Sequence, residues 1–334
     1  MRRVRIAGSQ TRGQRSRVSM LGVVSLLVGL LVIAAPARAT TPGTNGRIAY
    51  SRFADRTFRH ADIVSVNPDG TGVLKLTHTP DGTYDFNPDW SPDGTKVAFE
   101  RDMPGQGGIF SVNADGSNLR AITLAGFGDQ DPAWSPDGTR IAVERFDIPA
   151  GRDGIYYFNA DGSHPVQVTQ NDARGENEEP QWSPYGTKLI FGIASDTEGH
   201  ALFSINLDGS DEHQLTPWTL DALHADWSPD GRRIVFEAPD LDNLGPGESS
   251  NVYTIRPDGS HLAAVTHYQG GDLNATNPAW SPDGRKIVFV QVPGSGPFGY
   301  SDVFTMNADG TDINRVISST FWDFRPDWGI APSS

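Results

Sequence analysis

The stretch Trp90-Ser91-Pro92-Asp93-Gly94 decides the fold, because it returns along the chain at nearly regular intervals. The same five residues begin again at Trp134, Trp227 and Trp280; Tyr replaces Asp in the copy that begins at Trp182, and a broken copy ends the chain at Trp328. Successive tryptophans are 44, 48, 45, 53 and 48 residues apart. Such a period, about 40–50 residues, is typical of the four-stranded blades of β-propellers.

A second motif repeats in step with the first. It begins with Asn67-Pro68-Asp69-Gly70, and further copies start at Asn113, Asn159, Asn206, Arg256 and Asn307. The Asp-Gly pairs favour tight hairpin turns, since Gly adopts positive φ and the Asp side chain bonds nearby backbone. The short β-branched runs between the motifs, such as 96–99 and 109–112, favour strands. Each repeat therefore predicts four strands and no helix.

The two ends of the repeat region are incomplete in complementary ways. Residues 46–50 look like the strand that follows a Trp motif, yet no Trp precedes them, whereas 325–328 look like a first strand with nothing after it. Pairing these two strands would close a ring and remove its open edges. We predict an all-β fold: a single six-bladed β-propeller over residues 40–334, with four-stranded antiparallel blades and the C-terminal strand in the first blade. The six tryptophans are expected to be structural wedges between blades.

The N-terminus has the features of a secretory leader. Basic residues reach Arg17, an apolar run covers 18–35, and Ala37-Arg38-Ala39 forms a small-residue cleavage site. We expect cleavage after residue 39 and export to the periplasm, cell envelope or exterior, with no membrane insertion afterwards. An uncleaved anchor is the alternative, because an apolar run of 18 residues reaches the lower limit for crossing a bilayer.

Cysteine content and charge narrow the function classes. The chain has no cysteine, which excludes disulfides and thiolate metal sites. Its formal net charge is −14, and residues 1–39 hold seven arginines and no acid, so the remainder has 20 basic against 41 acidic residues, a net −21. That charge opposes binding to nucleic acids and anionic lipids, and it favours cations or basic protein surfaces.

The combined pattern resembles a known family. Pro-x-Trp-Ser-Pro-Asp-Gly, then a strand ending in Asn-x-Asp-Gly and a short strand ending in Leu-Thr or a similar pair, is similar to the TolB-type, WD-like propeller repeat from about residue 45 to 329. The resemblance implies a periplasmic propeller that binds partner proteins. The separate N-terminal α/β domain of TolB itself is not expected, because the first predicted blade starts a few residues after the leader.

Two enzyme families have similar repeats. Prolyl oligopeptidase-type peptidases carry a Gly-x-Ser-x-Gly nucleophile motif, which this sequence lacks. Oligogalacturonate lyases hold a metal on clustered histidines, whereas the eight histidines here are scattered along the sequence. We therefore expect a binding protein and no catalytic residues, with a carbohydrate-active lyase or hydrolase as the alternative.

The candidate binding residues precede the tryptophans, on loops expected to line the mouth of the central channel. The residues three positions before each Trp are all polar: Asn87, Asp131, Glu179, His224, Asn277 and Arg325. Five positions before Trp, the candidates are Asp85, Asp129 and Asp323. The simpler alternative is that Asp and Asn before Pro are local turn residues.

Several ligand classes fit these loops. We expect a protein or peptide partner or a cell-envelope glycan, bound by a monomer. Aromatic residues on the same loops suit either ligand or loop packing: Tyr84, Phe86, Phe127, Trp218, Tyr268, Phe298, Tyr300, Phe321, Trp322 and Phe324. No cofactor is expected, except that Ca²⁺ could bind if about six to eight oxygens converged at the mouth.

Overall fold

The computed structural model describes residues 43–53, 57–105, 107–123, 128–146, 151–239, 249–271, 273–293 and 300–333. The predicted leader and its cleavage site lie outside these ranges. Contacts divide the chain into Met1–Ala35 and Pro36–Ser334, and every described residue belongs to the second unit. Among the described residues, no helix has the length and apolar character needed to cross a membrane.

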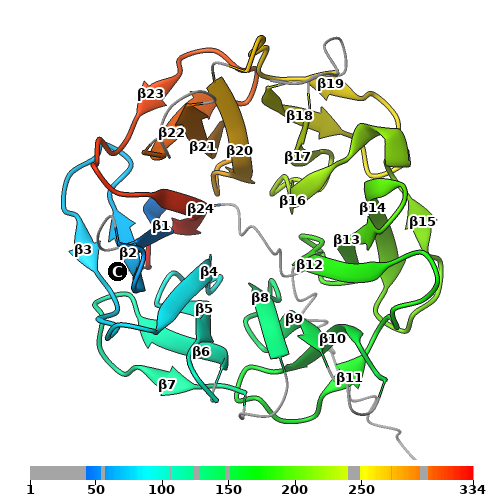
Figure 1. The fold of residues 1–334 in the computed structure, drawn as a ribbon, viewed down its shortest axis with the longest axis horizontal. Helices are drawn as coiled ribbons and strands as arrows, with labels where there is room; N and C mark the ends of the chain where they lie inside the picture. The colour runs from blue at the N-terminus through cyan, green and yellow to red at the C-terminus, as the bar shows by residue number, and fades with distance from the viewer. Residues whose placement is uncertain are drawn as a thin grey trace, which may run out of the picture. The chain divides into compact units, whose positions relative to one another are not determined.

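The second unit is a ring of twisted antiparallel sheets, confirming a β-propeller (Figure 1). One sheet contains β8 (Gly128–Trp134), β9 (Arg140–Phe146), β10 (Gly154–Asn159) and β11 (Val166–Gln167). The next contains β12 (Glu176–Trp182), β13 (Lys188–Ser195), β14 (Gly199–Asn206) and β15 (His213–Gln214). Two more contain β16 (Leu223–Trp227), β17 (Ile234–Pro239), β18 (Ser250–Ile255) and β19 (Ala263–Ala264), and β20 (Leu273–Trp280), β21 (Lys286–Pro293), β22 (Asp302–Asn307) and β23 (Asn314–Arg315).

The prediction of six separate four-stranded blades is wrong. Four blades are separate four-stranded sheets, but the other eight strands form one continuous sheet in the order β24-β1-β2-β4-β5-β6-β7, with β3 beside β2. Its strands are β1 (Asn45–Phe53), β2 (Ala61–Val66), β3 (Leu74–Lys75), β4 (Tyr84–Trp90), β5 (Lys96–Asp102), β6 (Gly108–Asn113), β7 (Arg120–Ala121) and β24 (Asp323–Ile330).

The joint between β2 and β4 has a local cause. A single parallel pairing, Ala61 with Tyr84, connects the two strands. The preceding loop is tied to the start of β2, because Gly82 N donates to Arg59 O at 2.7 Å and Ala61 N donates to Thr83 O at 3.3 Å. These bonds bring β4 alongside β2, which the repeat spacing could not indicate.

The C-terminal strand pairs with the first strand of the ring. β24 runs antiparallel to β1, with Trp328 opposite Ile48 and Phe324 opposite Ser51. This hydrogen-bonded contact joins residues nearly 280 positions apart in the sequence. No open strand edge remains at this point of the ring.

The tryptophans fill the spaces between neighbouring sheets. Trp134 of β8 packs in a cluster with Ala98 and Ile109 of the preceding strands, and Trp280 of β20 packs with Val235 and Val252. All six repeat tryptophans are buried. The core is therefore distributed around the ring. Burial of each Trp side chain contributes about 2–3 kcal/mol to the free energy of unfolding.

The Asp-Gly motifs form the turns. In the first Trp-Ser-Pro-Asp-Gly copy, Gly94 N donates to Ser91 O at 2.8 Å, while Ser91 Oγ and Thr95 N both donate to Asp93 Oδ1. At the Asn-x-Asp-Gly turn, Gly162 has φ +86°, and a Cβ there would collide with Ile122 O. This position therefore requires Gly for both its dihedral and its space.

One connection contains a helical turn that the repeat did not predict. Trp218–Leu220 forms a 3₁₀-helix, η1, between β15 and β16. It ends at Asp221, which has left-handed φ and ψ, and Leu220 is buried against the sheet of β16. The all-strand prediction was therefore incomplete here.

Candidate functional site

The six residues three positions before each Trp lie in β-bulges. The pairing between each first strand and its neighbour shifts register at this position, for example between Phe86 and Asp89 in β4 and between Glu178 and Gln181 in β12. Their φ angles fall between 47° and 53°, in the left-handed region: Asn87, Asp131, Glu179, His224, Asn277 and Arg325. Left-handed backbone costs a residue with a side chain about 1–2 kcal/mol, and bulges re-aim side chains. They are bulge residues, and not simple local turn residues.

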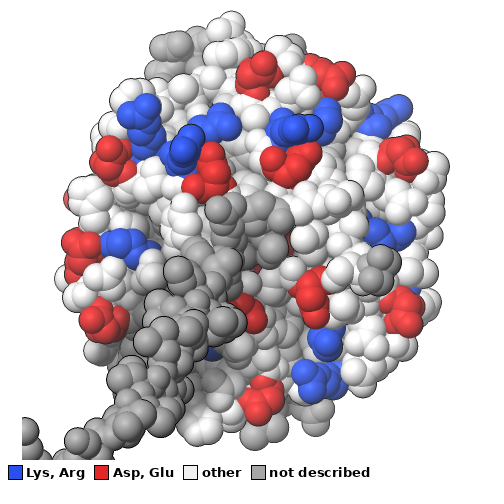
Figure 2. All heavy atoms as spheres, turned by 180° about the vertical axis from the view of Figure 1, so that it is seen from behind, with Lys and Arg blue, Asp and Glu red and all other residues white. Residues whose placement is uncertain are grey.

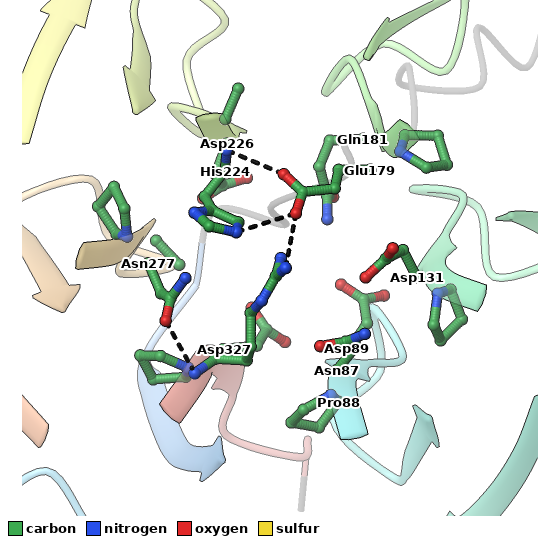
Figure 3. Close-up of a pocket in the computed structure, with 17 residues that line it drawn as sticks. Asn87, Pro88, Asp89, Asp131, Glu179, Gln181, His224, Asp226, Asn277 and Asp327 are labelled. Carbon is green, nitrogen blue, oxygen red and sulfur yellow. Dashed lines mark hydrogen bonds and ion pairs between the residues drawn. The ribbon is translucent and has the colours of Figure 1, made fainter. Parts of the chain in front are cut away.

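These six residues converge on one pocket at the centre of the ring (Figure 3). The cavity has a volume of about 90 Å³, and all six line it. The first strands that carry them contact one another in sequence around the ring, from β4 through β8, β12, β16 and β20 to β24 and back to β4. The structure thus brings together residues spread over 239 positions of the chain, from 87 to 325.

An ion-pair network crosses this pocket. His224 Nε2 lies 2.9 Å from Glu179 Oε1, and its Nδ1 lies 2.9 Å from an oxygen of Glu237. Arg325 Nη2 lies 2.6 Å from the same Glu179 Oε1. Burial and Arg325 lower the pKa of His224, but Glu179 and Glu237 outweigh them and raise it to about 9. Burial acts to raise the pKa of Glu179, yet Arg325 and His224 lower it well below its usual value.

Three carboxylates line the pocket one position before a Trp. Asp89, Asp226 and Asp327 accept hydrogen bonds from the backbone N of Trp134, Trp280 and Trp90, at 2.6–2.7 Å. Each bond crosses to the next first strand of the ring. Burial raises the pKa of Asp226 to about 7 and that of Asp327 to about 6. Sequence reasoning missed this set, although the recurrent Asp before Trp was a visible signal.

The three aspartates five positions before Trp do not line the pocket. Asp85, Asp129 and Asp323 are buried, and each forms a two-bond ion pair with an arginine, respectively Arg101, Arg145 and Arg52. They stand directly opposite these arginines in the strand pairing, before the bulge redirects the chain. Their placement at the channel mouth was wrong, because the arginine at the end of each second strand was not considered.

A second set of carboxylates lies behind the bulges. Glu100, Glu144 and Glu237 occupy the same register position on β5, β9 and β17, opposite the residue that precedes each bulge. Burial and the Asp131 carboxylate raise the pKa of Glu100 to about 8. Sequence reasoning missed these residues because they lie on second strands, away from the repeated motif.

An open aromatic hollow adjoins the pocket. Phe53, Phe58, Tyr84, Phe86 and Trp322, with Asp102, line a hollow of about 700 Å³, which we call the aromatic hollow. Their rings contact one another mostly edge to face, as Phe53 does with Phe58 at 5.0 Å. A smaller hollow of about 360 Å³ has Phe53, Trp322, His224 and Asn277 in its lining. It shares the first two residues with the aromatic hollow and the last two with the pocket, so residues of both sites border this one space.

The predicted aromatic residues are thus divided. Tyr84, Phe86, Trp322 and Phe324 line the hollows, whereas Trp218 packs on Phe203 and Tyr268 packs against the core cluster that contains Trp280. Phe127 and Phe298 lie outside the described residues.

The mouth contains both carboxylates and a guanidinium group. Among the described residues, no group of three or more His, Asp or Glu side chains is arranged to hold one. The Arg325 guanidinium also lies against Glu179, where a cation would otherwise compensate that carboxylate. Binding of Ca²⁺ stays a prediction from the sequence.

The outer surface carries both signs of charge. Figure 2 shows acidic and basic side chains interspersed around the rim of one face of the ring. Exposed ion pairs among the described residues include Lys188 with Asp211, and Arg174 with Asp172 and Glu212. Such pairs contribute about 0–1 kcal/mol each.

Comparison with known proteins identifies the family. A family model described as the TolB beta propeller domain matches residues 42–216, which is more than half of the chain. A TolB homolog of Chlorobium luteolum is 30% identical over 271 residues, covering 81% of this chain but only 57% of that protein. The chain therefore spans little more than half the length of that relative.

Solved structures agree on the fold. TolB of Acinetobacter baumannii superposes with a TM-score of 0.68 at 19% identity, over 86% of this chain and 67% of that one. An oligogalacturonate lyase solved in complex with manganese superposes with a TM-score of 0.53 at 15% identity, over 82% of this chain and 74% of that one. At these identities the likeness extends to the propeller alone. Together with the family match, it shows that the chain belongs to the TolB β-propeller family.

Proposed function

We propose that this protein is an exported, monomeric propeller of the cell envelope or exterior that binds a protein or peptide partner at its channel mouth. The observation that carries the proposal is the convergence of six left-handed bulge residues on one pocket beside the aromatic hollow. Unfavourable backbone at six equivalent positions is maintained by the surrounding sheets, and such conformations cluster at functional sites. The TolB-related proteins support a binding role, without identifying the partner.

A peptide fits the mouth better than a glycan does. Sugar hydroxyls require several hydrogen-bonding groups, and burying them unpaired is costly. In the aromatic hollow the only charged lining residue among those described is Asp102, and the Tyr84 hydroxyl already donates to Phe58 O at 3.1 Å. The hollow therefore offers apolar contact, and the carboxylate-rich pocket beside it offers charge.

A double glycine variant tests this function. Asn87→Gly with Asn277→Gly removes two side chains that line the central pocket while keeping the left-handed backbone, which Gly adopts without strain. We expect at least a tenfold loss of affinity for the partner identified by cross-linking capture with the exported protein. The melting temperature should fall modestly, because the buried Glu100 loses its hydrogen bond from Asn87. The matched control is Asn118→Gly with Asp211→Gly, since both residues are exposed and also have positive φ.

The outcomes separate the alternatives. Unchanged partner affinity in the pocket variant, or equal loss in the control, would contradict a binding site at the mouth. Recovery of a glycan whose chain is cleaved by the protein would favour the carbohydrate-active alternative instead.

A further inference from the structure

The carboxylates behind the bulges are unequally compensated. Glu100 accepts a hydrogen bond from Asn87 Nδ2 at 2.9 Å, and Glu237 accepts one from Asn277 N and pairs with His224. Glu144 stands at the same register position on β9. It has no hydrogen bond or ion pair with any described residue, although it is only 5% exposed.

The surroundings of Glu144 are acidic. β9 packs against β12, which carries Glu176, Glu178 and Glu179. Burial, then Asp131, Glu178 and Glu179, raise the pKa of Glu144 to about 10. The charged groups that act most strongly on this carboxylate are therefore themselves carboxylates.

Glu178 is the second carboxylate without adequate compensation. Its side chain lies over Gly192, where an added Cβ would come 3.0 Å from Glu178 Cγ. Gly192 occupies the register position that holds Glu in β5, β9 and β17, so its lack of a side chain makes room for Glu178. Glu178 Oε1 is buried with no hydrogen-bond partner among the described residues, and His200 Nε2 lies 3.7 Å away.

The two cationic side chains of the pocket network already pair with other carboxylates. Arg325 pairs with Glu179, and His224 is shared by Glu179 and Glu237. His200, the imidazole nearest to Glu178, also pairs with Asp221 at the shorter distance of 2.8 Å. Among the described residues, the sector between β9 and β12 therefore has no cation that is not already paired with another carboxylate. The described residues offer no metal-binding group of three ligands here, which favours an organic cation.

We propose that Glu144 and Glu178 form a subsite for the ammonium or guanidinium group of a Lys or Arg side chain in the bound partner. The inference rests on the proposed function and names the chemistry that its partner must carry. A Lys ammonium has three donors and an Arg guanidinium five, so either can bond two carboxylates at once. Charge-assisted bonds of this kind are the strong ones in a partly buried site.

Peptide selection tests the subsite with random sequences in place of the natural partner. A phage-displayed random heptapeptide library is selected on the wild-type protein, on Glu144→Gln with Glu178→Gln, and on Glu100→Gln. Glu100→Gln is the matched control, because this buried residue has the same register position but already accepts a bond from Asn87. We expect the wild type and the control to enrich Lys or Arg at one fixed position, and the double variant to lose that preference.

Affinity measurements then decide the result. Replacing the enriched Lys by norleucine should weaken binding to the wild type at least tenfold, and to the double variant less than threefold. Enriched peptides without a basic residue, or an equal loss in both proteins, would overturn the subsite while leaving the binding function intact. Selection of no peptide at all would overturn the proposed function and the subsite together. Unfolding curves of each variant check that the fold is retained.

Discussion

The buried pair between Arg52 and Asp323 gives the sharpest test of how the ring is held closed. Arg52 lies on β1 and Asp323 on β24, and Arg52 Nε and Nη2 donate to the two oxygens of Asp323 at 2.6 and 2.8 Å. The Asp323 side chain is 0% exposed and the Arg52 side chain 16%. Asp323→Asn removes the charge and keeps the shape.

The magnitude follows from what the substitution leaves behind. Breaking a buried ion pair by removing one partner costs about 3–5 kcal/mol, because the other charge stays buried without compensation. Since the Arg52 guanidinium retains some exposure, we expect the lower end, about 3 kcal/mol. For a domain of this size that corresponds to a fall in melting temperature of about 6–10 °C.

Urea unfolding followed by intrinsic fluorescence measures the loss. The matched control is Asp211→Asn, which breaks an exposed pair with Lys188 of the same 2.6 Å length. It should cost less than about 1 kcal/mol. Replacing both buried partners, Arg52→Met with Asp323→Leu, should recover most of the stability. A loss of under about 1 kcal/mol in Asp323→Asn, equal to the control, would refute the reasoning.

Three further predictions concern stability. Because the pKa of Glu144 is raised in the folded state from 4.5 to about 10, the contribution of Glu144 to stability should fall as pH rises from about 4.5 to about 10. Glu144→Gln should remove this part of the dependence of melting temperature on pH. Because the pKa of His224 is raised from 6.5 to about 9, its charged imidazolium stabilises the folded state fully below about pH 6.5, and this contribution is lost as pH rises through about 9. The loss of stability in His224→Asn, measured by calorimetry, should therefore shrink over that window, and a constant loss would contradict the prediction. Gly162→Ala should cost about 1–3 kcal/mol in urea unfolding, and more than Gly151→Ala, which has positive φ but nothing within 4 Å of its added Cβ.

The repeat made the fold readable from the sequence, within limits. The period of the Trp motif predicted a propeller. The incomplete segments 46–50 and 325–328 predicted that the two ends of the repeat region pair, and β1 and β24 do so. The continuous sheet was not predictable, because it depends on the loop bonds of Gly82 and Thr83 and not on the motif. Hydrogen bonds in a variable loop leave no periodic signal.

The candidate site was predicted in part for a similar reason. The offset of three residues from Trp identified the bulge positions, since position in a repeat determines position around the ring. The prediction that the residues five positions before Trp line the mouth failed at Asp85 and Asp323. Strand pairing places each of them opposite an arginine of the neighbouring strand, which lies outside the Trp motif. Glu144 was missed because what distinguishes it, the lack of a partner among the described residues, depends on the packing of β9 against β12 and leaves no trace in the repeated motif.

The left-handed bulges have a consequence for how recognition in this fold can change. Each rim side chain is directed into the channel by the backbone of its own strand, and amide, carboxylate, imidazole and guanidinium groups all occupy this one geometry here. Side-chain identity at the mouth is thus separable from the construction of the ring. Evolution or a designer could exchange residues at these positions and alter the preferred ligand without redesigning the scaffold, provided that the paired residues Glu179, His224 and Arg325 are changed together.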